Sequence, residues 1–289
     1  MQTKQKLLDR LGILTDEVSP YLIEALDWIA ANELRHVELR SVQGMNILNF
    51  SSAEIADMLK EIESRGLFVS ALASPVFKCP LSPDRTTIQG DQFGQLEHHD
   101  VAGHFRLLHR ALDAADILRT RYIRIFSFWR EDDPESYAEE IAGRLYAAAE
   151  IAYSRGAILL LENEPSCNGG SAEEIGRLAA LADHPALKLL WDPGNEAFLG
   201  RPAYPDGYNS VKPYIAHVHL KDAIYHPDSG GQCVPIGRGS VDYAQQLAAL
   251  MKDGYTGLFT IETHYRPLNG STADGSAMSL NGLRQLLQH

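Results

Sequence analysis

The stretch AILLLENEPSCNGGSAEEIGRLAALADHPALKLLWD, residues 157–192, decides the fold. Its two ends, 157–163 and 187–192, are short runs rich in leucine and isoleucine, which is typical of strands covered on both faces. Between them, Ser171 and Glu174 have the spacing of a capping box, which predicts the start of a helix. Strand, helix and strand at a spacing of roughly 30 to 35 residues indicate one β/α unit of a parallel sheet.

The same alternation of short apolar runs and longer helical segments extends in both directions from this unit. Eight β/α units favour closure into a (β/α)₈ TIM barrel of the α/β class. A doubly wound open sheet is the main alternative, but it normally carries a glycine-rich phosphate turn after an early strand, and the sequence has none. We therefore predict a single domain over 1–289, with barrel strands between 11 and 266 and a C-terminal helix over 267–289. The predicted strands are ILTDEV (13–18), HVELRS (36–41), FVSALAS (68–74), YIRIFSF (122–128), AILLLEN (157–163), LKLLWD (187–192), IAHVHLK (215–221) and LFTIETH (258–264).

Two connections, residues 75–95 and 223–240, are longer than the turns around a helix require. Both follow the carboxyl end of a predicted strand, which is the face on which barrels build active sites. We predict that they help to cover a substrate, and a surface insertion without a role is the alternative. His98, His99 and His104 lie in or before the next helix, where we expect them on a solvated face.

Composition and charge narrow the class of protein. The 289 residues carry a formal net charge of −12 at pH 7, which repels polyanions, so we expect no nucleic-acid partner. No apolar run reaches the roughly 20 residues of a membrane-spanning helix, and the N-terminal residues lack the apolar core of a signal peptide. We therefore expect no membrane partner and a cytoplasmic location. Cys79, Cys167 and Cys233 are far apart and suggest neither a disulfide framework nor a zinc knuckle.

The fifth to eighth predicted strands each end in a polar residue that can bind a metal ion. A buried carboxylate at the end of an apolar strand is costly without a partner, and several of them on neighbouring strands repel one another. A divalent cation resolves this repulsion, whereas the alternative is that each residue separately caps a strand or pairs with a lysine or arginine. Three carboxylates and one imidazole favour Mn²⁺, with Mg²⁺, Co²⁺ or Zn²⁺ as further possibilities. The predicted ligands are Glu162, Asp192, His219 and Glu262, with Glu164 as the substitute for Glu162.

Short motifs recur in a fixed order along the predicted strands and loops. They are VELR (37–40), SPVFK (74–78), IRIFSFW (123–129), LLLENEP (159–165), WDPGN (191–195), HVHLKD (217–222), IGRG (236–239) and IET (261–263). Together, over residues 16–266, they resemble the xylose isomerase-like TIM-barrel superfamily, the sugar phosphate isomerase and epimerase group. The resemblance implies one divalent metal ion at the four predicted ligands, and it implies that Glu162 and Glu262 also exchange protons with the substrate.

The chemistry expected of such a site is proton transfer on a small carbohydrate. Isomerisation or epimerisation of a ketose or aldose requires a proton to leave a carbon next to a carbonyl and to return elsewhere or on the other face. A metal ion that binds the carbonyl and the adjacent hydroxyl stabilises the resulting enediolate. We therefore predict a metal-dependent sugar isomerase or epimerase of carbohydrate metabolism, with Glu162 and Glu262 as its catalytic residues.

Other polar residues near the strand ends are candidates for substrate binding. Many sugar epimerases of the superfamily have Asp-x-x-His after the sixth strand, whereas this chain has Asn195 at the histidine position. An asparagine can hydrogen-bond a hydroxyl group but does not titrate near neutral pH, which leaves the exact substrate open. A packed or supporting position is the alternative for His217, and solvation is the alternative for the two lysines. Pairing across the barrel mouth is the alternative for Glu38 and Arg40, and a surface charge between turn glycines is the alternative for Arg238. The substrate-binding candidates are Asn195, Arg238, Glu38, Arg40, Lys78, Lys221 and His217.

Functions of other kinds also fit parts of the pattern. A dehydratase or lyase of a keto-polyol, an inosose or a dehydroshikimate-like acid would use the same metal ion and bases, and only the fate of the enediolate would differ. An abasic-site endonuclease shares the fold but needs a histidine-rich zinc cluster and a basic groove, which this acidic chain does not suggest. A non-catalytic sugar or metal sensor is the third alternative. Homo-oligomers are common in the superfamily and are possible here.

Overall fold

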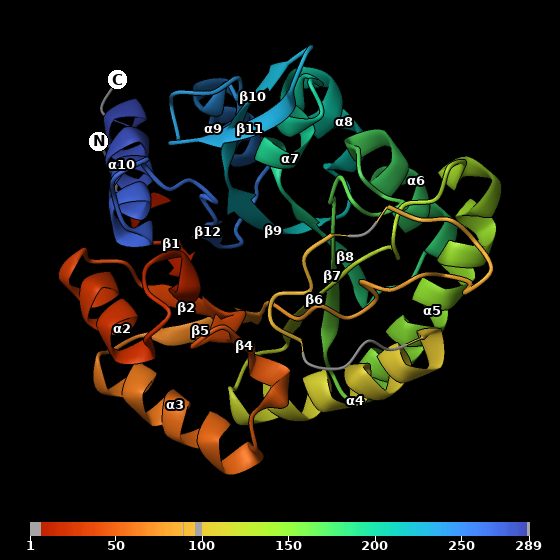
Figure 1. The fold of residues 1–289 in the computed structure, drawn as a ribbon, viewed down its shortest axis with the longest axis horizontal. Helices are drawn as coiled ribbons and strands as arrows, with labels where there is room; N and C mark the ends of the chain where they lie inside the picture. The colour runs from red at the N-terminus through yellow and green to blue at the C-terminus, as the bar shows by residue number, and fades with distance from the viewer. Residues whose placement is uncertain (1–6, 89, 96–99, 288–289) are drawn as a thin grey trace.

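The computed structural model describes residues 7–88, 90–95 and 100–287. A closed barrel of parallel strands, in the order β1-β12-β9-β8-β7-β6-β5-β2, forms its centre (Figure 1). Strands that follow one another in the chain are neighbours in this sheet, as successive β/α units require. The predicted (β/α)₈ barrel is confirmed. Its strands are β1 (Leu11–Leu14), β2 (His36–Leu39), β5 (Phe68–Leu72), β6 (Tyr122–Ile125), β7 (Ile158–Glu162), β8 (Leu187–Trp191), β9 (Ile215–Leu220) and β12 (Phe259–Ile261).

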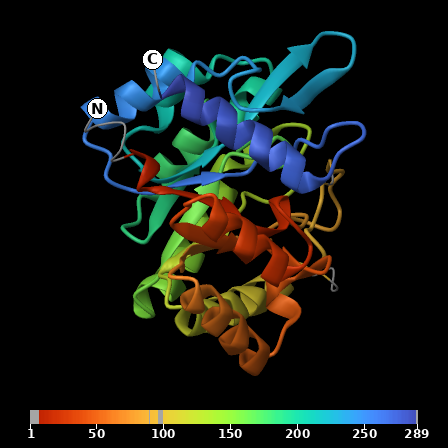
Figure 2. The same cartoon turned by 90° about the vertical axis from the view of Figure 1, so that its left-hand side faces the viewer.

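Helices form the outer layer of the barrel, and α10 (blue in Figure 2) lies on the outside beside the N-terminal segment (red). The predicted capping box is present, because the Ser171 hydroxyl accepts a hydrogen bond from the backbone N–H of Glu174. Ser51 and Glu54 form another at the start of α3. Within the described residues, no helix is long and apolar enough to cross a membrane. The helices are α2 (Leu22–Ala31), α3 (Ser52–Ser64), α4 (Val101–Ile117), α5 (Ala138–Ser154), α6 (Ala172–Ala182), α7 (Pro193–Phe198), α8 (Tyr208–Val211), α9 (Tyr243–Lys252) and α10 (Thr272–Leu286), with shorter turns η1 (Thr15–Glu17), η2 (Ile47–Asn49), η3 (Pro134–Tyr137) and η4 (Ala203–Gly207).

The first barrel strand ends earlier than predicted. The sequence suggested a strand over 13–18, but β1 ends at Leu14 and the chain turns into η1. Arg40, which follows the neighbouring strand β2, holds this turn. Its Nε lies 2.9 Å from Asp16 Oδ2, and its Nη2 lies 2.8 Å from Glu17 Oε1. Two ion pairs at the rim of the barrel, one buried and one partly buried, therefore stabilise the turn that follows β1.

The second long connection, residues 223–240, contains an antiparallel hairpin over the carboxyl end of the barrel. Asp222 fastens its base, because its Oδ2 accepts hydrogen bonds of 2.9 Å from the backbone N–H of both Gly237 and Gly239. Its Oδ1 accepts a further bond of 3.1 Å from Val241 N. The hairpin strands are β10 (Asp222–His226) and β11 (Gly230–Val234), and a smaller antiparallel pair consists of β3 (Ser41–Val42) and β4 (Met45–Asn46).

The first long connection, residues 75–95, packs against the start of α4 through a histidine. His104 is 1% exposed, and its Nδ1 accepts a hydrogen bond of 2.7 Å from Phe77 N. The expectation that His104 lies on a solvated face is therefore wrong, because its ring satisfies a buried backbone donor of the connection. His98 and His99, which were expected on the same face, lie outside the described residues.

Candidate metal centre

Four side chains from adjacent strands converge at the carboxyl end of the barrel. Glu162 is the last residue of β7, and Asp192 directly follows β8. His219 lies near the end of β9, and Glu262 directly follows β12. All four are at most 1% exposed. One ligand atom of each lies within 4.8 Å of the others, so the structure brings the four predicted ligands together.

Local ion pairs and hydrogen bonds fix the orientation of these side chains. His219 Nδ1 lies 3.2 Å from both Glu162 Oε1 and Glu262 Oε2. Asp192 is the N-cap of α7, where its Oδ1 accepts hydrogen bonds from Gly194 N at 2.8 Å and from Asn195 N at 3.1 Å. The N-cap role therefore holds one carboxylate oxygen in place and leaves Oδ2 for another partner.

The partner of Asp192 Oδ2 is the ammonium group of Lys221, a residue that is 2% exposed. Its Nζ lies 2.9 Å from Asp192 Oδ2 and 2.9 Å from Glu262 Oε2, and it donates a hydrogen bond of 3.2 Å to Asn195 Oδ1. Burial lowers the pKa of Lys221, but Asp192 and Glu262 outweigh burial and hold this pKa well above its usual value. Gly194 allows this approach, because a Cβ there would collide with the backbone carbonyl of Lys221. Lys221 is therefore a charged part of the cluster and not a solvated lysine.

Two buried arginines complete the set of cations around the carboxylates. Arg40 Nη1 lies 2.9 Å from Glu262 Oε1. Arg124 Nη1 lies 3.2 Å from Glu162 Oε2 and 3.2 Å from Glu262 Oε1, so one guanidinium bridges the two glutamates. Sequence reasoning missed Arg124, although the signal was present as an arginine inside the otherwise apolar strand YIRIF. A buried arginine is rarely found without a carboxylate partner.

Glu38 and His217 lie beneath the cluster. Glu38 Oε2 is 3.0 Å from His219 Nε2, and Glu38 Oε1 is 2.6 Å from His217 Nε2. His217 Nε2 also lies 3.0 Å from the hydroxyl of Thr260. Both oxygens of Glu38 are thus engaged by histidines, and Glu38 and His217 are fully buried or nearly so. This position supports His219 and differs from the substrate contact expected for Glu38.

The remaining predicted residue, Arg238, is exposed in the loop that Asp222 fastens. Its backbone N–H donates a hydrogen bond of 2.9 Å to the carbonyl of Pro235. In the described part of the chain, the hydrogen bonds and ion pairs of the cluster do not include Arg238. The structure therefore does not bring Arg238 together with the other predicted residues.

The electrostatics of the cluster follow from burial and from opposite charges in contact. Burial lowers the pKa of His219, but the neighbouring carboxylates outweigh it and hold this pKa well above its usual value. Burial raises the pKa of Glu262, yet Lys221, His264 and His219 outweigh burial and hold it well below its usual value. For Asp192, burial dominates and raises the pKa. The raised pKa of His219 favours a proton on both ring nitrogens, so a metal ion has to compete with a proton for Nδ1.

The donor set fits a divalent cation. Three carboxylates and one imidazole nitrogen are hard ligands of the kind that Mn²⁺ and Mg²⁺ prefer. Glu162 Oε1 and Asp192 Oδ2 are buried and accept no hydrogen bond from the described residues, although each lies at ion-pair distance from a cation. His219 presents Nδ1 to the carboxylates while its Nε2 faces Glu38. An imidazole fixed on its far side by a carboxylate is typical of metal-binding histidines.

A cavity of about 400 Å³ adjoins the cluster. Asn195 and Lys221, which both contact Asp192, form part of its lining. Lys78 and Glu164 line it further out, and Glu164 has a pKa lowered to about 2, because Lys78 and Lys221 outweigh the effect of burial. A small molecule bound there would reach the edge of the cluster. Other residues lining this cavity include Ile88, Phe93, Phe198, Cys233 and His264.

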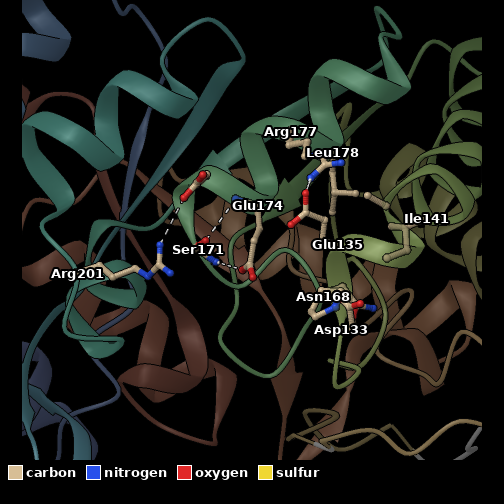
Figure 3. Close-up of a pocket in the computed structure, with 12 residues that line it drawn as sticks. Asp133, Glu135, Ile141, Asn168, Ser171, Glu174, Arg177, Leu178 and Arg201 are labelled. Carbon is tan, nitrogen blue, oxygen red and sulfur yellow. Dashed lines mark hydrogen bonds and ion pairs between the residues drawn. The ribbon is translucent and has the colours of Figure 1, made fainter.

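Another hollow, of about 330 Å³, lies at the outer rim beside α5 and α6 (Figure 3). Two pairs of its charged side chains contact one another: Arg177 contacts Glu135, and Arg201 Nη1 lies 3.8 Å from Glu173 Oε2. The described residues that line this hollow include none of the predicted ligands. We therefore place the candidate site in the barrel mouth.

Comparisons with known proteins agree with this architecture. No curated protein matches the chain. Among solved structures, a xylose isomerase-like TIM barrel protein from Mycobacterium smegmatis in complex with magnesium is 18% identical, with a TM-score of 0.66 over 92% of this chain and 87% of that one. A 3-keto-D-glucoside 4-epimerase from E. coli is 13% identical, with a TM-score of 0.69 over 97% and 99%. A probable 3-DHS dehydratase from Bacillus anthracis is 16% identical, with a TM-score of 0.68 over 96% and 97%.

These likenesses to solved structures, all below 25% identity, show a shared fold. The family is shown by a different comparison, in which the sequence model of the xylose isomerase-like TIM barrel family matches residues 26–286. That match spans the strands that supply the cluster and most of the outer helices. The chain therefore belongs to the xylose isomerase-like TIM barrel family.

Proposed function

We propose that this protein is a divalent-metal-dependent isomerase or epimerase that moves protons on a small carbohydrate. The observation that carries the proposal is the convergence of Glu162, Asp192, His219 and Glu262, all buried, beside a cavity that can hold a small molecule. Burying three carboxylates in one place is costly. Lys221, Arg40 and Arg124 offset part of that cost, and a divalent cation that also serves catalysis would offset more of it. The fold is shared with an epimerase and with a magnesium-containing protein, which agrees with the proposal.

Glu162, Asp192, His219 and Glu262 would hold the metal ion, and Mn²⁺ is the ion that this mixed donor set favours. When bound, the ion would act as a Lewis acid that polarises the carbonyl group next to the reacting carbon. Three carboxylates would supply the negative charge that balances it.

Glu162 and Glu262 are the groups we assign to proton transfer. They come from β7 and β12, which are separated in the barrel by β8 and β9, so they approach the cluster from different sides. Arg124 lies between them, because its Nη1 is 3.2 Å from Glu162 Oε2 and 3.2 Å from Glu262 Oε1. Asn195, held by Lys221, can hydrogen-bond a hydroxyl group of the substrate.

Hydrogen exchange with solvent tests this function. Purified protein with added Mn²⁺ would be incubated in deuterated water with ketoses, keto acids and inosose, and the mixtures would then be freed of Mn²⁺ and followed by NMR. We expect deuterium to enter the carbon next to the carbonyl of a carbohydrate, without loss of water. Glu162→Gln and Glu262→Gln should each slow the exchange by about 10²- to 10⁴-fold.

The matched control is Glu131→Gln, which removes a buried carboxylate that is paired with Arg85 away from the cluster. This control should exchange at the wild-type rate. If the substrate loses a hydroxyl group in this experiment, the reaction is a dehydration and not an isomerisation. Full exchange rates in both Glu162→Gln and Glu262→Gln would overturn the proposed roles of these glutamates.

A further inference from the structure

Lys78 and Glu164 form a charge pair that leaves hydrogen-bonding capacity unused. Both line the cavity beside the cluster. Lys78 Nζ lies 3.6 Å from Glu164 Oε2, which is close enough for attraction between the charges but too long for a hydrogen bond. A hydroxyl group beside the two atoms could accept a hydrogen bond from the ammonium and donate one to the carboxylate.

The ammonium group of Lys78 is held by aromatic rings. Its Nζ lies 4.2 Å from the centre of the Phe93 ring, 4.5 Å from Phe126 and 5.5 Å from Trp129. These contacts attract the positive charge, but ring faces are weak acceptors for N–H donors. Lys78 is 1% exposed, and none of the hydrogen bonds among the described residues involves its Nζ. The ammonium at the cavity wall therefore has an ion-pair partner in Glu164 but no hydrogen-bond acceptor among the described residues.

Only one of the two carboxylate oxygens of Glu164 accepts hydrogen bonds from the described residues. Its Oε1 accepts hydrogen bonds from Ser166, at 2.8 Å from the hydroxyl and 3.3 Å from the backbone N–H. Its Oε2 faces Lys78 across the 3.6 Å gap. Ser166 therefore fixes the carboxylate while Oε2 keeps its capacity to accept a hydrogen bond.

The charges around this pair decide which ligand suits it. Lys78 and Glu164 together are neutral, and Asp91 adds a negative charge to the cavity lining. The other lysine in the lining, Lys221, is already engaged by Asp192, Glu262 and Asn195. The described residues that line the cavity include no arginine, the residue most suited to phosphate and carboxylate groups. An anion placed here would meet Glu164 at close range, whereas an uncharged hydroxyl group would not be repelled.

We propose that Lys78 and Glu164 bind uncharged hydroxyl groups of the substrate, so that this cavity selects a neutral polyol over a phosphorylated or carboxylated one. This inference deepens the proposed function and rests on it for the assignment of the cavity as the substrate site. It assigns Lys78 and Glu164 to specificity and leaves proton transfer to the glutamates of the cluster.

Calorimetric titration of the full chain with Mg²⁺ present tests the selectivity. The probes are the four D-ketohexoses as uncharged ligands, with D-fructose 6-phosphate and D-gluconate as anions of similar size. We expect at least one ketohexose to bind about tenfold or more tightly than either anion. Lys78→Met, which keeps the side-chain volume among the rings, should weaken ketohexose binding by about tenfold or more, as expected for the loss of a charged hydrogen bond.

Glu164→Gln should change the selectivity in a different way. It removes the negative charge but keeps the shape, so the affinity for D-fructose 6-phosphate should rise relative to that for the ketohexose. The matched controls are Lys60→Met and Asp57→Asn, which alter an exposed lysine–carboxylate pair on α3 with a distance of 2.7 Å. Both controls should keep the wild-type preference.

Several results would overturn the inference. They are a wild-type protein that prefers an anion, a wild-type protein that binds no ketohexose, and Lys78→Met and Glu164→Gln variants that both keep the wild-type preference. Because Glu164→Gln is close in shape to the native residue, it remains informative if Lys78→Met fails to fold. Selective ketohexose binding without any deuterium exchange would refute the proposed reaction and leave this inference standing.

Discussion

Replacing Glu38 by glutamine is expected to weaken Mn²⁺ binding without disturbing the fold. Glu38 contributes no atom to the four-residue cluster, yet its Oε2 lies 3.0 Å from His219 Nε2. A carboxylate at this position keeps the proton of the imidazole on Nε2, so that Nδ1 is free to bind a metal ion. Glutamine keeps the shape but loses the charge, and its amide can offer an acceptor oxygen to only one of His217 and His219.

The expected magnitude follows from what this contact provides. Loss of the group that supports a metal-binding histidine typically weakens metal affinity by about 10- to 100-fold. That range corresponds to about 1.4 to 2.7 kcal/mol at 25 °C. A charge-assisted hydrogen bond contributes about 1.5 to 3 kcal/mol, so the loss of the one between Glu38 and His219 accounts for the effect.

The assay is titration of metal-free protein with Mn²⁺, followed by the electron paramagnetic resonance signal of the free ion. The matched control is Glu150→Gln, because Glu150 Oε1 lies 2.6 Å from His184 Nε2 in a carboxylate–imidazole pair of the outer helices. The control should bind Mn²⁺ as the wild type does. A Glu38→Gln protein that binds Mn²⁺ within twofold of the wild type would refute the reasoning, and so would an equal loss in the control.

Three further predictions follow from the same cluster. Lys221→Met should lower the stability of the metal-free protein to urea by about 3 to 5 kcal/mol, because it removes the ammonium that contacts the buried carboxylates, and added Mn²⁺ should restore part of the loss. An unchanged stability would contradict these ion pairs. Because the pKa of His219 is raised well above its usual value, a proton competes with the metal ion for this side chain. The Mn²⁺ affinity measured by calorimetry should therefore be about tenfold lower at pH 6 than at pH 7, and equal affinities would exclude this competition. Gly194→Ala should destabilise the protein to urea by about 1 to 3 kcal/mol, because its Cβ would collide with the carbonyl of Lys221, and an unchanged midpoint would disprove that contact.

Much of the fold could be predicted from the sequence, because the eight strands are short apolar runs at regular spacing. The residues of the cluster could be predicted for a related reason. Glu162, Asp192 and Glu262 are charged groups at the ends of apolar strands, where an isolated carboxylate would be costly. Parallel closure of the barrel then brings them to one rim together with His219.

The depth of each side chain in the barrel could not be predicted in the same way. Glu38 was expected at the mouth but lies beneath His219, and the pairing of β2 with β5 is irregular between Val37 and Glu38. Such a shift of register depends on contacts between strands that a single sequence does not reveal. Arg124 was missed because its ion-pair partners, Glu162 and Glu262, are distant in the chain, so its role can be recognised only from the structure.

The aromatic surroundings of Lys78 were also beyond sequence reasoning. Its ammonium meets Phe93, Phe126 and Trp129, which come from two separate connections of the barrel. The sequence left open whether Lys78 is solvated, because solvation is the usual state of a lysine. Only the packing of loops over the barrel mouth shows that it is buried.

Anomalous scattering from crystals grown with Mn²⁺ would show whether the four side chains bind one divalent ion. We expect one strong anomalous peak within roughly 2.0 to 2.6 Å of an oxygen of Glu162, Asp192 and Glu262 and of His219 Nδ1. The peak should disappear in crystals of His219→Ala grown under the same conditions. Absence of a peak at the four side chains of the wild type, or a peak elsewhere in the barrel, would contradict this expectation.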